Sequence, residues 1–338
     1  MSSVNMELVA QMADVSIATV SRVINSPERV AAATRERVLA VMRQLGYRYN
    51  AVAGGLSRQQ TKTLGVIVPT IVNPIFAEST RGIQAVAQAN GYALLTGITD
   101  YSADEEARLV ETFGQHRVDG LLVTSSHVES PELIAAQRAG TPVVLTYSSR
   151  LRSPLPLVGV DNAAAAANAV GHLLRLGHRR IAMLAGSFGI SDRSFARYQG
   201  YTAALAAFGV TVDAMLLAEV PYTLEGGLNG VQRLLALDER PTAIFCSNDL
   251  LASVALRAVL DVGLAVPTDL SIIGFDDSPL AAFMNPRLTT VYQPAYEMGR
   301  RACELLLRII GGEQPLEQRI ILPTELRVRE TTAPPQAL

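Results

Sequence analysis

Polar side chains recur at the ends of short apolar runs, where side chains of this kind could bind a small polar molecule. They are Asn73, Asp161, Asn248, Asp249, Asp276, Asp277 and Gln293. Ligands of open α/β sheets bind outside the carboxyl ends of the strands, so these positions predict a binding cleft. A single Asp or Asn after a strand more often caps the next helix, and we assign Asp249 and Asp277 to that role. Asn248 and Asp276 are then the better ligand candidates, because amide and carboxylate groups form hydrogen bonds with hydroxyls.

A second set of functional side chains lies near the N-terminus, between Ser16 and Asn25. Ser16 is expected to cap a helix that carries small hydroxyl side chains, which suit phosphate contacts. The same helix carries Arg22, which can bind a guanine edge with two hydrogen bonds. These residue types at helical spacing indicate a helix that reads DNA. A helical mini-domain that binds another protein is the alternative on pattern alone.

Three short helices are expected to position the N-terminal side chains. Apolar residues at helical spacing predict a first helix over about 5–14, a second that begins after Ser16, and a third from about Ala32 to Leu45. Gly46 follows the third helix as its C-cap. Two helices joined by a tight turn and braced by a third form a helix-turn-helix, whose second helix fits the major groove.

The charge of the chain is divided unevenly. The formal net charge is −2, yet residues 1–62 carry eight basic and four acidic side chains, a charge of +4. The remaining residues carry 21 basic and 27 acidic side chains, a charge of −6. A small basic segment on an acidic body favours a polyanionic partner for the basic segment, although a solvated basic surface has the same composition.

The body of the chain reads as alternating strands and helices. Short apolar runs typical of buried parallel strands cover residues 63–69, 92–98, 119–125, 142–147, 180–186, 243–249 and 271–277. Helical patterns between them cover residues 76–90, 104–116, 162–176 and 194–208. This alternation predicts βαβ units, and therefore an α/β fold of parallel sheets flanked by helices.

Composition and missing motifs exclude several classes of protein. The 338 residues are 49% hydrophobic and 18% charged, which predicts two or three folded domains. Two cysteines provide neither a disulfide framework nor a cysteine zinc site, and the histidines form no helical metal pair, so we expect no metal or cofactor. No apolar run is long enough to span a membrane and no secretory signal is apparent, which predicts a cytoplasmic protein. Dinucleotide, phosphate-loop and nucleophile-elbow motifs are also missing.

The N-terminal segment carries one fixed pattern of residues. They are Val9, Ala10, Ala13, Val15, Ser16, Thr19, Val20, Ser21, Arg22, Val23, Ile24, Asn25, Thr34, Arg35, Leu45, Gly46, Tyr47, Asn50, Ala51, Val52, Ala53 and Leu56. This pattern closely resembles the DNA-binding head of the LacI/GalR family of bacterial repressors. The resemblance implies phosphate contacts from Ser16, Thr19, Ser21, Asn25 and Arg35. It implies base reading by Ile17, Ala18 and Arg22.

In that family a hinge helix follows the third helix and inserts a leucine into the minor groove of a palindromic operator. The resemblance places Leu56 at this point, with Ala53 beside it. The chain departs from the family pattern at Ala31, Tyr49, Gly54 and Gly55. Each glycine inside a helix costs roughly 0.8–1.0 kcal/mol against alanine. We therefore expect the free-energy cost of folding the hinge helix to be about 2 kcal/mol higher. Operator binding should be weak unless the rest of the chain favours the DNA-bound state.

The stretch over residues 245–277 and the later segment 285–294 resemble the effector domain of the same repressors, which is similar to two-lobed periplasmic sugar-binding proteins. The resemblance implies a helix-turn-helix domain over 1–49, a hinge over 50–62 and an effector-binding and dimerisation domain over 63–331. Its first lobe would comprise about 63–160 and 291–320, and its second lobe about 161–290 and 321–331.

The same resemblance implies an effector pocket between the lobes. It is formed by Asn73, Phe76, Tyr147, Arg197, Tyr222, Asn248, Asp276 and Gln293. Asp192 and Arg193 are weaker candidates. Thr146 and Tyr147 stand where many relatives have an acidic residue, and Arg197 is kept. A sugar acid is therefore somewhat favoured over a neutral sugar as the effector.

The sequence as a whole predicts a transcriptional regulator, most simply a repressor of a carbohydrate or sugar-acid operon. It would bind double-stranded operator DNA as a homodimer, with no membrane partner, and a small sugar-like effector would control it. Whether the effector induces or co-represses stays open. The competing hypotheses are a solute-binding protein of a transport system and an enzyme that uses the strand-end carboxylates. The basic head argues against the first, and the lack of a nucleophile or cofactor loop argues against the second.

Overall fold

A computed structural model of the chain describes residues 5–47, 60–125, 130–148 and 153–336, and the backbone but not the side chain of Asn25. The chain separates into two units, Met1–Thr61 and Lys62–Leu338. The predicted DNA contacts of Ala53, Leu56 and the Asn25 side chain lie outside the described residues, and so do Tyr49, Gly54 and Gly55.

Capping residues and apolar spacing set the helices of the N-terminal unit. Its elements are α1 (Met6–Met12), α2 (Ile17–Asn25), the 3-10 turn η1 (Pro27–Arg29) and α3 (Ala32–Leu45). The side chain of Ser16 accepts a hydrogen bond from the Thr19 amide at 3.2 Å, and Gly46 ends α3 at a φ of +63°. The apolar faces meet in a core of Val9, Ala10, Ala13, Val20, Val23 and Val38. The predicted helix-turn-helix is confirmed.

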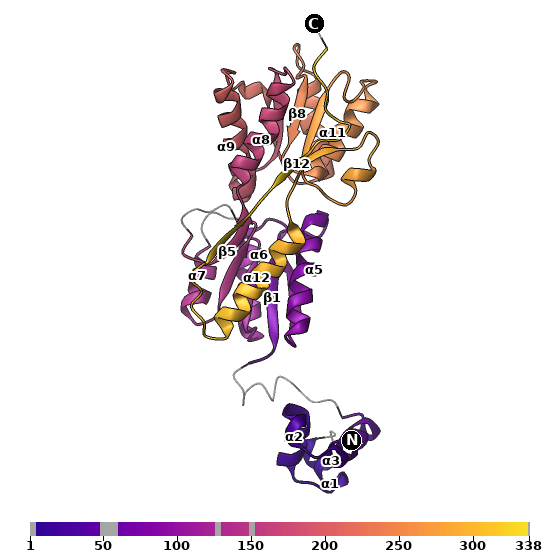
Figure 1. The fold of residues 1–338 in the computed structure, drawn as a ribbon, viewed down its shortest axis with the longest axis vertical. Helices are drawn as coiled ribbons and strands as arrows, with labels where there is room; N and C mark the ends of the chain where they lie inside the picture. Colours follow the sequence, from indigo (N-terminus) through magenta and orange to yellow (C-terminus); the bar gives the residue numbers. More distant parts are fainter. Residues whose placement is uncertain (1–4, 48–59, 126–129, 149–152, 337–338) are drawn as a thin grey trace. The chain divides into compact units, whose positions relative to one another are not determined.

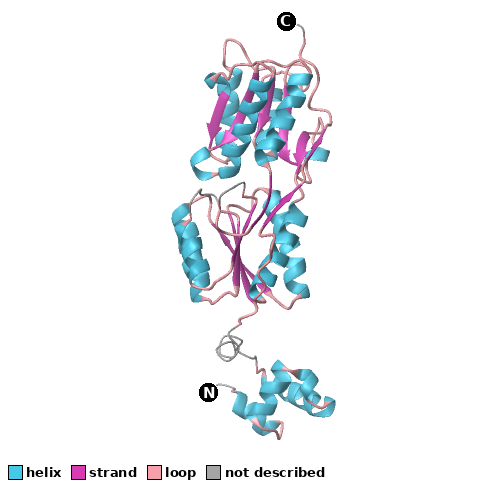
Figure 2. Cartoon of the chain, turned by 60° about the vertical axis from the view of Figure 1, so that its left-hand side comes forward, coloured by secondary structure: helices cyan, strands magenta, loops and turns pink. Residues whose placement is uncertain are grey.

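The first lobe of the second unit is built on a six-stranded parallel sheet with the order β11-β5-β4-β3-β1-β2. Its strands are β1 (Thr63–Val68), β2 (Ala93–Ile98), β3 (Gly120–Val123), β4 (Val143–Thr146), β5 (Leu157–Val160) and β11 (Arg319–Leu322). Its helices are α5 (Pro74–Ala89), α6 (Ala103–Gln115), α7 (Pro131–Arg138) and α12 (Ala295–Ile310). Helices cover both faces of the sheet (Figure 2).

The second lobe repeats this architecture with the strand order β12-β10-β9-β8-β6-β7, in which only the β10–β12 pair is antiparallel. Its strands are β6 (Ile181–Gly186), β7 (Leu217–Val220), β8 (Ala243–Cys246), β9 (Ser271–Asp276), β10 (Thr289–Tyr292) and β12 (Glu325–Arg327). Its helices are α8 (Asn162–Arg175), α9 (Asp192–Ala207), α10 (Leu224–Leu235) and α11 (Asp249–Asp261). Short 3-10 turns are η2 (Phe188–Ile190), η3 (Ala214–Leu216) and η4 (Ala281–Phe283). The predicted α/β class with parallel-dominant sheets is confirmed.

The chain passes between the two lobes three times (Figure 1). The first crossing lies between β5 and α8, the second between β10 and α12, and the third between β11 and β12. Each lobe is therefore completed by a segment from the C-terminal part of the chain. Because both sheets present strand ends to the junction, side chains far apart in sequence meet there.

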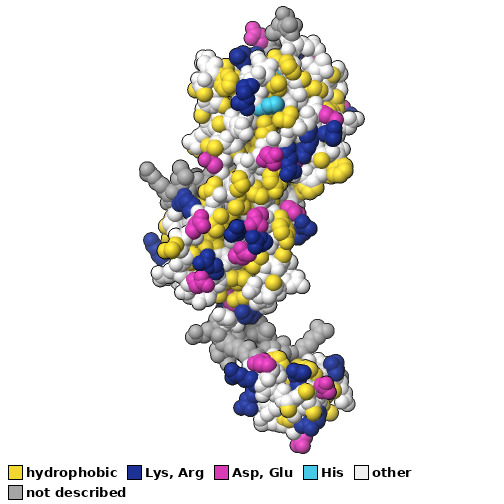
Figure 3. Space-filling model, viewed as in Figure 1, with side chains coloured by type: hydrophobic (Ala, Val, Ile, Leu, Met, Phe, Trp, Pro, Cys, Tyr) yellow, Lys and Arg dark blue, Asp and Glu magenta, His cyan; other side chains and the backbone are white. Residues whose placement is uncertain are grey.

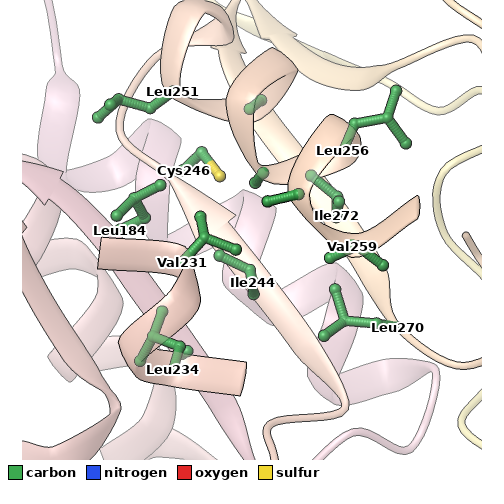
Figure 4. Packing of buried hydrophobic residues seen from close by; sticks show 14 of the residues in the cluster. Leu184, Val231, Leu234, Ile244, Cys246, Leu251, Leu256, Val259, Leu270 and Ile272 are labelled. Carbon is green, nitrogen blue, oxygen red and sulfur yellow. The ribbon is translucent and has the colours of Figure 1, made fainter. Parts of the chain in front are cut away.

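Buried aliphatic side chains fill the space between sheet and helices in each lobe. In the second lobe, Leu184 and Ile244 of the sheet pack against Val231 of α10 and Leu251 and Val259 of α11 (Figure 4). These side chains are almost fully buried, and such packing holds the strand ends in fixed positions. No helix in the described part of the chain is long and apolar enough to cross a membrane.

Helices α5 and α12 of the first lobe pack unusually closely, through glycines. A Cβ atom on Gly299 would lie 1.9 Å from the backbone oxygen of Ser79, and one on Gly82 would lie 2.1 Å from the backbone oxygen of Tyr296. The solvent side of α12 carries alternating charges, with Glu297 bonded to both Arg300 and Arg301. Figure 3 shows basic and acidic side chains interleaved on this part of the surface.

Replacing Gly299 by alanine is expected to lower the free energy of unfolding by at least about 1–3 kcal/mol, because the clash is with backbone that cannot move aside. Gly114→Ala is the matched control, since Gly114 lies in α6 with no atom within 4 Å of the added Cβ. This control should gain up to about 1 kcal/mol from helix propensity. Urea unfolding of the full chain, followed by circular dichroism, measures both. Equal midpoints for the two variants would contradict the close packing.

Candidate functional site

One pocket lies at the junction of the two lobes, where the strand ends meet. Its walls are formed by Asn73, Ile75, Phe76, Tyr101, Tyr147, Ser191, Arg193, Arg197, Tyr222, Asn248, Asp276 and Gln293. All eight residues that the sequence singled out for an effector pocket are in this set. Sequence reasoning did not single out Ile75, Tyr101 and Ser191, and it treated Arg193 as a weaker candidate.

Asp276, at the end of β9, lies at the centre of the pocket's hydrogen bonds. Its carboxylate is 2% exposed and accepts hydrogen bonds from the Asn73 amide at 3.0 Å and the Gln293 amide at 2.6 Å. The Arg197 guanidinium lies 3.8 Å away. Burial raises the pKa of Asp276, and the positive charge of Arg197 opposes that shift. These bonds link a residue of the first lobe and a residue of the crossover to the second-lobe sheet.

Arg197 extends from α9 across the floor of the pocket. Its Nε donates to Asn162 Oδ1 at 2.8 Å, and its Nη1 donates to the backbone oxygen of Ser247. The guanidinium lies 3.6 Å from the centroid of the Phe275 ring, on its face. Burial lowers the pKa of Arg197, whereas Asp276 raises it. Arg197 is thus held in one orientation by four neighbours.

Two pairs of aromatic rings form the apolar walls. Phe76 and Tyr147 meet edge to face, with ring centroids 5.3 Å apart, and the Tyr147 hydroxyl donates to the Ile75 carbonyl at 2.8 Å. Tyr101 of the first lobe stacks on Tyr222 of the second, with centroids 5.0 Å apart. Flat apolar faces of this kind suit the C–H faces of a sugar ring.

Hydrogen bonds join the lobes directly around the pocket. Besides the bond between Asn73 and Asp276, the Ser148 hydroxyl donates to Asp192 at 3.1 Å and Arg193 Nη1 donates to the Ser125 carbonyl at 2.8 Å. The space left between the lining side chains is about 20 Å³, which is room for about one water molecule. A sugar-sized ligand therefore requires the lobes to move apart for entry.

The assignment of helix caps at two strand ends is wrong. Asn248, not Asp249, caps α11, because its side-chain oxygen accepts from the Leu251 amide at 2.8 Å. Asp249 instead accepts from the Ser278 amide at 2.6 Å and the Thr290 hydroxyl at 2.5 Å, and so anchors the loop after β9 to β10. Asp277 caps no helix either, since its carboxylate pairs with two arginines of the C-terminal segment, Arg327 and Arg329.

The buried carboxyl of Asp249 predicts a pH dependence of stability. Burial, assisted by the charge of Asp276, raises the pKa of Asp249 from 3.8 to about 8. An acid whose pKa rises on folding stabilises the protein below the pKa of the unfolded chain, and this contribution is lost as the pH rises through about 8. The melting temperature of the wild type should therefore fall between about pH 4 and pH 8 and level off above pH 8, and Asp249→Asn should flatten the profile in that range.

Melting curves at half-unit pH steps test this, with the surface substitution Asp261→Asn as the control. Parallel profiles for the wild type and the Asp249 variant would show that Asp249 is already ionised at neutral pH.

The other candidate surface is the exposed side of α2 in the N-terminal unit. Ile17 is 46% exposed, and Ser16, Ala18 and Arg22 are exposed as well. Thr19, Ser21 and Arg35 are half-buried. Because Val20 and Val23 point into the core on the opposite side, the predicted base-reading residues all face solvent.

The comparisons agree with this architecture. Residues 5–50 match the family described as bacterial regulatory proteins, lacI family, and residues 170–332 match a periplasmic binding protein-like domain. The HTH-type transcriptional repressor CytR of Escherichia coli (strain K12) is 38% identical over 331 residues, which cover 98% of this chain and 97% of CytR.

Two solved structures are similar over nearly their whole length. The complex of the transcriptional regulator CelR with cellobiose has a TM-score of 0.74 at 32% identity, with 97% of this chain and 99% of that chain covered. The lac repressor dimer bound to operator and the anti-inducer ONPF has a TM-score of 0.86 at 28% identity, with 98% and 99% covered. The chain therefore belongs to the lacI family of bacterial regulatory proteins and is a DNA-binding transcriptional regulator.

Proposed function

We propose that this regulator is a cytoplasmic repressor that binds a palindromic operator as a homodimer and is controlled by a carbohydrate or sugar-acid effector. The repressor role follows the description of CytR, and the dimer on operator follows that of the lac repressor structure. The sugar-like effector follows the cellobiose complex of CelR. In this proposal residues 1–49 read DNA, 50–62 form the hinge and 63–331 bind the effector and form the dimer.

The N-terminal unit would read the operator with the exposed side of α2. Ile17, Ala18 and Arg22 contact base edges, with Arg22 as the bidentate donor. Phosphate contacts come from Ser16, Thr19, Ser21, Asn25 and Arg35. Ala53 and Leu56 act at the centre of the palindrome. Because phosphate contacts release counterions, operator affinity should fall steeply with salt.

The observation that carries the effector proposal is the single pocket in which all eight predicted residues meet. Asp276 and Asn248 supply hydrogen bonds to hydroxyls, and Phe76 and Tyr222 supply flat apolar faces. Groups from both lobes line the pocket, so a ligand there changes the angle between the lobes. That change would alter the separation of the two hinge segments of a dimer, and therefore the fraction of molecules able to bind DNA.

Selection of duplexes from a random pool by the full chain tests the DNA-binding part of the proposal. A palindromic site should emerge, bound by one dimer. A chain reduced to residues 62–338 should lose duplex binding and keep ligand binding. Undiminished duplex binding by the shortened chain would contradict the proposal.

A further inference from the structure

The pocket contains two buried arginines, and their free donors differ. A guanidinium binds a carboxylate most strongly through a pair of parallel N–H groups, such as Nε with Nη2. This chain uses that pair at its surface, where Nε and Nη2 of Arg300 donate to the two carboxylate oxygens of Glu297. Nε and Nη2 of Arg108 donate to the two oxygens of Glu105 in the same way, whereas those of Arg287 both donate to one oxygen of Glu330.

Arg197 does not keep its Nε–Nη2 pair for a ligand. Its Nε–H donates to Asn162, and one of the two N–H groups on its Nη1 donates to the Ser247 carbonyl. Its charge also faces Asp276 at 3.8 Å. Arg197 can therefore still donate to a ligand from Nη1 and Nη2, but its Nε–Nη2 edge is not open to a carboxylate.

Arg193 has the complementary pattern. It lines the pocket at 5% exposure, and its Nη1 donates to the Ser125 carbonyl at 2.8 Å and to Asp192 at 3.2 Å. Toward the residues that the structure describes, Nε and Nη2 of Arg193 donate no hydrogen bond. The edge that Arg300 uses for a carboxylate is thus unused in a buried arginine of the pocket wall.

The charges of the pocket favour an acid as well. Burial lowers the pKa of Arg197, and the neighbouring cation of Arg193 lowers it further. Among the described residues that line the pocket Asp276 is the only carboxylate, while Asp192, outside the lining, pairs with Arg193 at 3.2 Å. A ligand carboxylate would relieve the repulsion between the two cations.

Gln293 indicates what the rest of the ligand carries. Its Nε2 donates to Asp276 at 2.6 Å, which fixes the orientation of the amide. Its Oε1 is then buried without a hydrogen-bond partner in the described structure, in a side chain that is 2% exposed. A buried acceptor without a partner is costly, and a ligand hydroxyl is the donor that fits it.

We propose that the effector is a polyhydroxy carboxylic acid whose carboxylate binds Nε and Nη2 of Arg193 and whose hydroxyl donates to Gln293 Oε1. This inference rests on the proposed function, since it names the ligand of the proposed effector pocket. Arg193 is thereby the residue that distinguishes an acid from a neutral sugar, while Arg197 holds the floor of the pocket in place.

Calorimetric titration of the full chain tests this proposal. The ligands are D-gluconate, D-galactonate and D-xylonate, the aldose that corresponds to each of them, and glucose 6-phosphate. At least one aldonate should bind tenfold or more tighter than its aldose, and tighter than the phosphate ester. Arg193→Gln should bring the ratio of the two affinities near one, and Arg193→Lys should lose most of it because an ammonium offers no fork. The control Arg257→Gln, at a surface fork on Asp261, should leave the ratio unchanged.

The outcomes separate this inference from the proposed function. Tighter binding of the aldoses would contradict the proposal that the effector is a carboxylic acid, but it would agree with a carbohydrate effector. Tighter binding of glucose 6-phosphate would replace the carboxylate by a phosphate. An unchanged ratio in a folded Arg193→Gln or Arg193→Lys variant would overturn the assignment of Arg193. Binding of none of the seven compounds, by a chain that still binds DNA, would contradict the proposed effector class itself.

Discussion

Replacing Asp276 by alanine is expected to reduce effector affinity by at least about 100-fold, because the carboxylate can accept two charge-assisted hydrogen bonds from ligand hydroxyls, each worth about 1.5–3 kcal/mol. The same substitution removes the acceptor of both Asn73 and Gln293 and leaves Arg197 without its counter-charge. Breaking a buried pair in this way costs about 3–5 kcal/mol of stability. Calorimetric titration and urea unfolding of the full chain measure the two effects.

Asp261→Ala is the matched control, since Asp261 pairs with Arg257 at the surface of α11. Loss of that exposed pair should change stability by no more than about 1 kcal/mol and leave ligand binding intact. If Asp276→Ala proved as harmless as this control, Asp276 could not be the centre of the pocket.

Arg22→Ala is expected to have the second large effect, on operator recognition. One bidentate contact to a base discriminates by about 1–3 kcal/mol, and a dimer on a palindrome makes the contact twice. The affinity for the selected operator should therefore fall by about 30-fold or more, while the affinity for random duplex should fall only slightly. Fluorescence anisotropy with both duplexes at one salt concentration measures the ratio.

Arg43→Ala removes the same charge from an exposed site on α3, outside the predicted contact set. It should weaken binding to both duplexes about equally and preserve their ratio. Equal losses on both duplexes for Arg22→Ala would show that Arg22 contacts phosphate and not a base.

Local chemistry explains which features the sequence predicts well. The bounds of α3 follow from its apolar spacing and from Gly46, and the start of α2 follows from Ser16. These signals can be read from the sequence because a capping residue bonds to the backbone of residues only a few positions away. The apolar runs that the sequence singles out all become strands, because a short, mostly apolar run bounded by turn residues is typical of a buried strand. The shorter runs of β5, β7, β11 and β12 carry too few residues to be recognised as strands by themselves.

The pocket shows where sequence reasoning ends. The rule that ligands bind at strand ends finds Asp276, but it cannot tell which of two neighbouring polar residues turns into the cleft. That is decided by the Ser278 and Thr290 contacts of Asp249 and by the arginines on Asp277. Tyr101 follows a predicted strand and could have been found by the same rule. The orientation of Arg193 depends on its hydrogen bond to Ser125, 68 positions away in the sequence. No local sequence pattern can therefore predict that Nε and Nη2 of Arg193 are left for a ligand.

The most direct test of the account is the operator affinity of the full chain, measured by anisotropy with and without a saturating concentration of the aldonate that binds tightest. If effector binding and DNA binding are thermodynamically linked, saturating the pocket with the aldonate should change the dissociation constant for the operator by about 5–150-fold, in either direction. An aldonate that saturates the pocket while the operator affinity stays the same within error would contradict the linkage.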